Sequence, residues 1–189
     1  MPPPTSSSFT IKANPGGLLG VLTTQCHISG VILAPAPGAV APTSHSFVAI
    51  WDTGAQCSVI TAGVAAACGL TPTGVTNVTG VHGGAKLCFT YLVNIRLLNG
   101  VEVRGVRVAE GQLQGGIHGD VLIGMDIITL GDFAITNKGG NTWFSFRTPS
   151  QLSTDYVADH NAAVQRTLNH GHGGTRKPKP GKKFGRQKK

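Results

Sequence analysis

The sequence has few charged residues and few aromatic residues, which make up 13% and 6% of its 189 residues. Its 27 glycines and 11 prolines disfavour long helices. An apolar content of 40% is nevertheless enough for the core of one domain of ordinary size with tails. We therefore expect one domain that is built from many short strands and turns.

The sequence also has no C-x-x-C pair among its four cysteines, which are Cys26, Cys57, Cys68 and Cys88. Each lies in apolar sequence, so we expect buried free thiols, although the spacing leaves disulfides open. The only close pairs of metal ligands are Cys26-His27 and His170-Gly171-His172, and neither has a second pair at finger-like spacing. We expect no metal and no cofactor.

Segments that direct a chain to a membrane are not apparent either. The first residues, Met1 to Pro4, have no basic region followed by an apolar run. No stretch reaches membrane-spanning length without glycine, proline or polar interruption. We expect no membrane contact and, by default, a reducing cytoplasmic location.

The formal net charge of +8 comes from one end of the chain. Residues 175–189 contain eight of the 16 Lys and Arg and no acid, and the remaining eight balance the eight Asp and Glu. Such a tail contacts nucleic-acid phosphates weakly and in a salt-dependent way, or it remains a solvated end that aids solubility. Its composition leaves both readings open.

The hydrophobic pattern places short elements along the chain. Strand-like sequence occupies 9–12, the apolar runs 18–22 and 28–33, residues 46–51, and a pair at 91–98 and 101–108 joined by Asn99-Gly100. A final hairpin is expected from 133–135 and 142–146. Short helices are predicted at 61–68, before Gly69, and at 154–168.

The most informative motif is Asp52-Thr53-Gly54-Ala55, which follows the apolar residues 48–51. A strand that ends in an acid, a hydroxyl residue and a glycine places a titratable carboxylate at a tight turn. By itself the tripeptide arises by chance in chains of this length. Its context is more specific, because a glycine-rich hairpin tip at 79–84 and then Leu122-Ile123-Gly124 follow it.

Together these motifs resemble those of the retropepsin-like aspartic proteases, the single-domain relatives of retroviral proteases. The resemblance covers about residues 9–149, and the helix at 61–68 is closer to the cellular and bacterial members. It implies an all-β closed barrel of short strands with a glycine-rich flap hairpin and one or two short helices. The expected segments are a disordered arm (1–8), the protease domain (9–149), a short helix (150–170) and a disordered basic tail (171–189).

The resemblance also implies an aspartic endopeptidase that acts on peptides or proteins as a homodimer, with Asp52 of each chain as the catalytic residue. Two adjoining carboxylates share a proton and activate water without a covalent intermediate. Supporting roles are implied for three groups of residues. They are the active-site loop (Thr53, Gly54, Ala55), the flap (Gly80, Val81, His82, Gly83, Gly84) and the structural motif (Leu122, Ile123, Gly124, Asp126).

Two positions depart from the viral pattern, which has an acid after Asp-Thr-Gly-Ala and an arginine after the apolar-apolar-glycine motif. Gln56 and Met125 stand there instead, so the dimer lacks that ion pair. Asp126 is interpreted as a structural brace of its turn. The alternative function is a non-catalytic dimerising or peptide-binding module of the same fold, with nucleic acid bound through 175–189.

Overall fold

The computed structural model describes residues 6–14, 16–32, 38, 40–79, 84–113 and 119–171. The chain divides into two compact units, unit 1 (Met1–Gln151) and unit 2 (Leu152–Lys189). The strands of unit 1 are β1 (Ser7–Lys12), β2 (Thr23–Gly30), β3 (His45–Trp51), β4 (Val59–Ile60), β5 (Gly74–Thr79), β6 (Ala85–Arg96), β7 (Glu102–Glu110), β8 (Val121–Ile123), β9 (Asp132–Thr136) and β10 (Trp143–Thr148). Its helices are α1 (Ala62–Ala67), α2 (Met125–Ile128) and the 3-10 turns η1 (Leu98–Gly100) and η2 (Lys138–Gly140).

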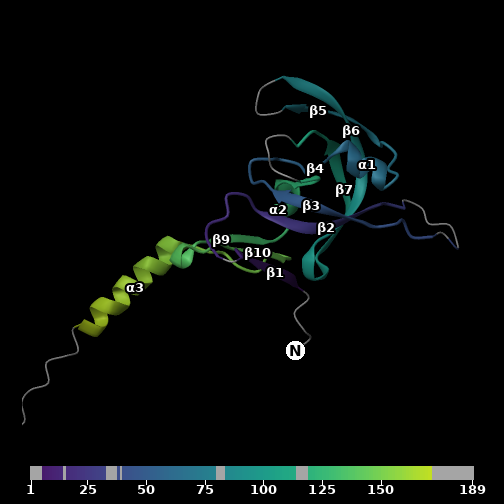
Figure 1. Cartoon of the computed structure of the whole chain (residues 1–189). Helices are drawn as coiled ribbons and strands as arrows, with labels where there is room; N and C mark the ends of the chain where they lie inside the picture. Colours follow the sequence, from purple (N-terminus) through teal and green to yellow (C-terminus); the bar gives the residue numbers. More distant parts are fainter. Residues whose placement is uncertain are drawn as a thin grey trace, which may run out of the picture. The chain divides into compact units, whose positions relative to one another are not determined.

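Six strands of unit 1 close into a barrel (Figure 1). Their order is β2-β3-β8-β4-β7-β6, and the barrel closes because β6 pairs back onto β2, with Ile28 opposite Ile95. β8 is parallel to β3 and antiparallel to β4, while β4 is parallel to β7. Closure leaves these strands without a free edge along the seam. The predicted all-β closed barrel is confirmed.

The strand β2 differs from the expectation drawn from apolar runs. Residues 18–22 form no strand, and Leu18 is 70% exposed. The strand lies instead at Thr23–Gly30, where Thr24, Cys26 and Ile28 alternate into the core. Alternation, rather than a continuous apolar run, is what a strand with one buried face requires.

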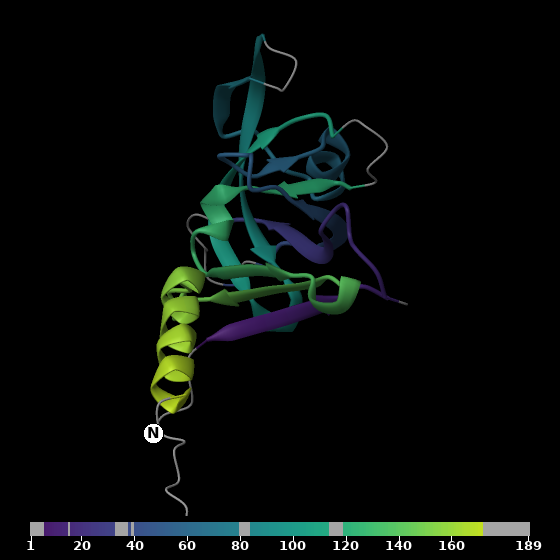
Figure 2. The ribbon, with the colours of Figure 1, turned by 90° about the vertical axis from the view of Figure 1, so that its left-hand side faces the viewer.

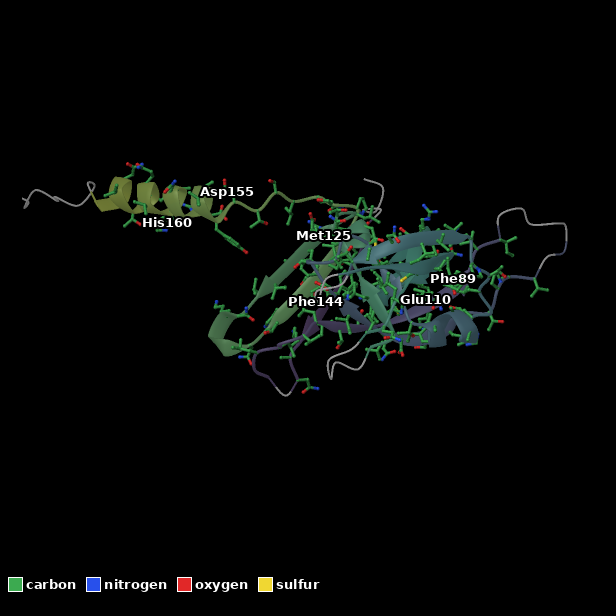
Figure 3. All side chains as sticks on the ribbon, turned by 90° about the horizontal axis from the view of Figure 1, so that it is seen from above. Phe89, Glu110, Met125, Phe144, Asp155 and His160 are labelled. Atoms are coloured by element: carbon green, nitrogen blue, oxygen red, sulfur yellow. The ribbon has the colours of Figure 1, made fainter. Side chains whose placement is uncertain are left out.

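A second sheet, β1-β10-β9, carries the aromatic part of the core. The aromatic rings of this sheet pack against each other and against Trp51 at the end of β3, with centroids separated by 5.1–6.1 Å. The contacts are edge-on or tilted, except for one stacked pair. These rings are Phe9, Trp51, Phe133, Phe144 and Phe146, of which Figure 3 labels Phe144. Such pairs contribute about 0.5–1.5 kcal/mol each beyond their buried area. Five of the chain's few aromatics therefore join this sheet to the barrel.

The β6–β7 hairpin turns at Asn99-Gly100, as the sequence predicts. Both residues have positive φ, 52° and 74°, which is the geometry of a tight turn that matches strand twist. Leu97 N–H donates to the Val101 carbonyl at 2.7 Å and closes the turn.

The β5–β6 hairpin projects from the end of the barrel opposite to the β1-β10-β9 sheet (Figures 1 and 2). Because β5 pairs only with β6 along its length, one face of this hairpin has no covering layer. Val75, Leu87 and Phe89 lie on that face and are 50–64% exposed. This is the hairpin whose tip the sequence assigns to a flap.

Helix α1 begins and ends where the sequence predicts. The Thr61 hydroxyl accepts from the Val64 N–H at 3.4 Å, and Gly69 leaves the helix at φ +57°. Val64 and Ala65 pack into the barrel core.

All four cysteines are free thiols, but only Cys26 is fully buried. The expectation of burial is wrong for Cys57, which is exposed, and Cys68 and Cys88 are half-buried. Cys57 lies in the loop after Asp52, and Cys88 lies on the projecting hairpin. Both positions are at the margin of the barrel core, which explains why neither thiol is fully buried. Burial raises the pKa of the Cys26 thiol to about 12, with a smaller effect of the Asp120 charge.

Unit 2 contains one described helix, α3 (Tyr156–Gly171), where the sequence predicts a helix at 154–168. The Asp155 carboxylate accepts from the N–H groups of Val157 and Ala158, at 2.9 and 3.0 Å, and caps the first turn. Figure 3 labels Asp155, which precedes this helix, and His160 within it. Among the described residues, none of the helices has the length and apolar character that crossing a membrane requires.

Candidate active site

The Asp52 loop leaves the barrel floor where β3 ends at Trp51. Asp52 N–H donates to the Ile123 carbonyl at 3.0 Å, which ties the start of the loop to β8. One carboxylate oxygen, Oδ1, accepts from Gly54 N–H at 2.8 Å, and the Asp52 carbonyl accepts from Ala55 N–H at 3.3 Å. This is an Asx turn, which folds the loop about the carboxylate. Asp52 is half-buried, while Thr53 and Gly54 are exposed.

The structural motif lies directly beneath this loop. β8 is inserted between β3, which leads into the loop, and β4, which leaves it, with Leu122 opposite both Ile50 and Val59. Met125 N–H then donates to the Ala55 carbonyl at 2.8 Å. The two motifs that are far apart in sequence are therefore in direct backbone contact.

Gly124 permits this contact because it has no side chain. A Cβ added there would lie 2.6 Å from the Cys57 carbonyl carbon and 2.7 Å from its oxygen, distances that real Cβ atoms essentially never show. Its φ of −95° is ordinary, so the requirement is for space and not for an unusual backbone conformation.

Ser58 and Asp126 brace the two ends of the loop. Ser58 Oγ donates to Asp126 Oδ1 at 2.8 Å and accepts from Gly124 N–H at 3.1 Å, and Ser58 N–H donates to Asp126 Oδ2 at 2.9 Å. Ser58 is fully buried, so this network replaces the water contacts that its hydroxyl loses. Asp126 is thus engaged through both carboxylate oxygens, and the sequence alone does not reveal that Ser58 is its partner.

Gln56 and Met125 occupy the positions where viral proteases carry an ion pair. Gln56 is exposed, and Met125 is half-buried against the core. Neither residue leaves an unpaired charge at the base of the loop.

Of the five flap residues, only Gly84 is described, with φ +83°. Gly80, Val81, His82 and Gly83 lie outside the described residues. The strands on either side of them, β5 and β6, are in register, with Thr79 opposite Ala85. Within the described part of the chain, no three His, Cys, Asp or Glu side chains gather as metal ligands do.

A small cavity that sequence reasoning missed lies beside the loop. It has a volume of about 140 Å³ and is lined by Cys57 from the loop, Thr76 and Thr90 from the β5–β6 hairpin, and Arg107, Val108 and Ala109 from β7. Three separate segments form it, and only tertiary pairing brings them together. A larger hollow of about 590 Å³ lies over the β1-β10-β9 sheet, between Lys12, Thr136 and Trp143, and contains no residue of either motif.

Part of the chain matches a family of known proteins. Residues 38–127, which contain both the Asp52 loop and the Gly124 motif, match the family of aspartyl proteases. The match confirms the resemblance to retropepsin-like aspartic proteases that the two motifs indicate in the sequence. No curated protein sequence matches the chain.

Two solved structures are similar to the chain. One is a retropepsin-like aspartic protease from Rickettsia conorii, which is 15% identical and has a TM-score of 0.44, with 76% of this chain and 96% of that chain covered. The other is the retroviral protease-like domain of Ddi1 from Leishmania major, which is 20% identical and has a TM-score of 0.37. This match covers 67% of this chain and 95% of that chain.

Proposed function

We propose that the protein is an aspartic endopeptidase that hydrolyses peptide bonds as a homodimer, with Asp52 of each chain in one shared site. The observation that carries the proposal is the position of Asp52. Its half-buried carboxylate stands at the end of a buried strand, in a loop that the Gly124 motif holds from below. A chain with one such loop supplies half of a two-carboxylate site, so activity requires two copies.

In the dimer, the two carboxylates are close enough to share a proton and titrate as a pair. The ionised member takes a proton from a water molecule, and the protonated member donates one toward the carbonyl oxygen of the scissile bond. No metal or other cofactor takes part in this reaction.

The exposure of Thr53 and Gly54 supports their proposed roles. Thr53 bonds across the dimer axis, and Gly54 lies against the substrate backbone, where a side chain would obstruct it. The Ala55 carbonyl accepts from the Met125 N–H and so fixes the loop. The flap tip from Gly80 to Gly84 closes over an extended peptide and excludes water.

The proposed location is the cytoplasm. Four free thiols in one chain are stable in a reducing compartment, where disulfides rarely form.

The test compares the wild type with Asp52→Asn on a diverse peptide library across pH. The amide oxygen of the introduced asparagine can still accept from Gly54 N–H, so the variant is expected to fold and dimerise, but to lose cleavage and the response to a statine-type inhibitor. Asp159→Asn, the same change on α3, is the matched control and should cleave normally. Full activity of Asp52→Asn would show that the catalytic group lies elsewhere.

The second candidate, a non-catalytic module that binds nucleic acid, rests on the eight basic residues of 175–189. It predicts salt-dependent binding of single-stranded RNA or DNA that deletion of 175–189 removes, with unit 1 still folded. Binding of this kind by a chain that cleaves no peptide would favour this candidate over the endopeptidase.

A further inference from the structure

We propose that the cavity beside the Asp52 loop is a substrate subsite that selects an acidic side chain, Asp or Glu, through Arg107 and Thr90. The inference rests on the proposed endopeptidase function and names the class of peptide that the site prefers. The cavity has a volume of about 140 Å³, well below the roughly 300–1,000 Å³ of typical small-molecule pockets, so it fits one side chain.

Arg107 supplies the positive charge. Its side chain is exposed at the mouth of the cavity and has neither a hydrogen bond nor an ion pair among the described residues. A guanidinium binds a carboxylate through two parallel N–H groups, a geometry that an amide or an apolar side chain does not reproduce.

Thr90 supplies a hydrogen bond that the folded chain leaves unused. The residue is only 2% exposed, yet its Oγ1 has no hydrogen-bond partner among the described residues. A buried hydroxyl without a partner is costly and uncommon, and it marks a place where a ligand atom is expected. The Thr90 carbonyl, in contrast, accepts from both the N–H and the hydroxyl of Thr73.

The two polar groups converge on one point, the backbone of Gly74. A Cβ added at Gly74 would lie 3.3 Å from Thr90 Oγ1 and 3.6 Å from a guanidinium nitrogen of Arg107. The Thr90 hydroxyl and the Arg107 guanidinium therefore lie close to each other beside Gly74, near enough for one carboxylate to accept from both.

The position of the cavity relates it to the substrate. Cys57 on one wall belongs to the loop that carries Asp52, and Thr76 on the other wall belongs to the hairpin that ends in the flap. A peptide between loop and flap passes this opening. Val108 and Ala109, which are buried, also line the cavity.

Neighbouring charges favour an acid. Lys86 is opposite Val78 in the β5–β6 register, on the same face of the hairpin as Thr76 and Thr90. Neither Asp126 nor Glu110 is paired with Arg107, since Asp126 accepts from Ser58 and Glu110 accepts from the Tyr91 hydroxyl at 2.6 Å.

The test uses the full-length protein and peptides in which each position around the cleaved bond is in turn Glu, Gln or Leu. At one position, kcat/KM for the Glu peptide should exceed that for the isosteric Gln peptide by about tenfold. Arg107→Gln should bring this ratio close to one. Arg104→Gln removes the same charge from the same strand but from outside the cavity, so it should keep the ratio.

Two further variants act without a change of charge. Thr90→Val keeps the shape of the side chain and removes the hydroxyl, and Gly74→Ala places a methyl group between the hydroxyl and the guanidinium. Both should lower the Glu-to-Gln ratio at that position. Thr90→Val should also fold at least as stably as the wild type, because the hydroxyl it removes has no partner.

The outcomes separate the subsite from the enzyme. Cleavage with equal kcat/KM for Glu and Gln at every position would overturn the subsite and leave the endopeptidase standing. If the wild type cleaves nothing, the endopeptidase fails, and calorimetric binding of the same peptides to Asp52→Asn decides the subsite alone. Tighter binding of the Glu peptide, lost in Asp52→Asn/Arg107→Gln, supports it, and equal binding of Glu and Gln peptides overturns it.

Discussion

At the scale of single residues, the geometry of the Asp52 loop depends on groups that carry no catalytic chemistry. Gly124 leaves room for the Cys57 backbone, and buried Ser58 links Asp126 to the Gly124 N–H. Each contact joins the Asp52 loop to the segment that follows β8. Small changes at these residues should therefore displace the loop, even though none of them touches a substrate.

Gly124→Ala should destabilise the protein and lower cleavage together. The methyl group would lie 2.6 Å from a backbone carbon, which cannot move without the loop. Overpacking of this kind costs about 1–3 kcal/mol. Urea unfolding and peptide cleavage measure the two effects.

Gly63→Ala is the matched control. Gly63 is an exposed residue of α1, and a Cβ there meets only Thr61 Oγ1, at 3.7 Å. This change should stabilise by about 0.5–1 kcal/mol, because alanine is the better helix former. Equal stability of Gly124→Ala and wild type would contradict the steric role of Gly124.

Tyr91 stabilises unit 1, and this contribution is lost at alkaline pH. Burial and the hydrogen bond to Glu110 raise the pKa of Tyr91 from 10.0 to about 12. Because the folded state holds the phenol proton more tightly, this contribution is complete below pH 10 and is lost as the pH rises toward 12. The unfolding free energy of wild type minus that of Tyr91→Phe should fall across this range.

Tyr156→Phe serves as its control, because Tyr156 is 72% exposed on α3. The corresponding difference in unfolding free energy should be small. A difference for Tyr91→Phe that does not fall between pH 10 and pH 12 would contradict the coupling of Tyr91 to Glu110.

At the scale of elements, adjacent residues encode the turns, whereas long-range pairing decides which faces of the strands are exposed. The Asn99-Gly100 turn needs only two adjacent residues that tolerate positive φ, so it is visible in the sequence. The exposed apolar face of the β5–β6 hairpin is not visible in this way. Val75, Leu87 and Phe89 are apolar, and the projection of the hairpin beyond the barrel explains their exposure.

Gly100→Ala should weaken the β6–β7 hairpin. A Cβ at φ +74° costs about 1–2 kcal/mol, which should appear as a lower midpoint of urea unfolding. Gly20→Ala is the control, since a Cβ there meets nothing within 4 Å and the backbone conformation does not require glycine. An equal effect of the two changes would rule out turn strain as the cause.

At the scale of the whole molecule, the buried core is confined to unit 1. Its members run from Phe9 to Phe146, whereas the described side chains of 151–169 are exposed. Ser150 and Gln151 complete the hydrogen bonds of Asp132 and belong with unit 1. The roles of 1–8, 9–149, 150–170 and 171–189 as separate functional segments stay predictions.

A chain that ends at Gln151 should therefore keep the unfolding midpoint of unit 1 and the cleavage activity. The proposed site takes one Asp52 from each of two copies, so the specific activity of this chain and of the full chain should fall at dilutions where sedimentation detects monomers. Loss of cleavage on truncation, at concentrations where the full chain is active, would assign residues 152–189 to the site or to the dimer.

The sequence by itself determined the features that adjacent residues encode. The Asp52 loop, the helix after Thr61, the Asn99-Gly100 turn and the strand alternation of the last hairpin all depend on local backbone preference. The family resemblance followed from two such motifs in a fixed order, and it extended to the closed barrel. Only the end of β2 overlaps the predicted run 28–33, because the buried residues at its start include Thr24 and Cys26, which do not form an apolar run.

Only the tertiary structure decided which distant residues meet. Ser58 joins Asp126, and Arg107, Thr90 and Cys57 surround one cavity, because the barrel register brings β4, β6, β7 and β8 together. Register depends on the packing of the whole core, and no short segment of sequence encodes it. The carboxylate that we propose as catalytic could therefore be predicted from its own loop, whereas the residues proposed to select the substrate could not.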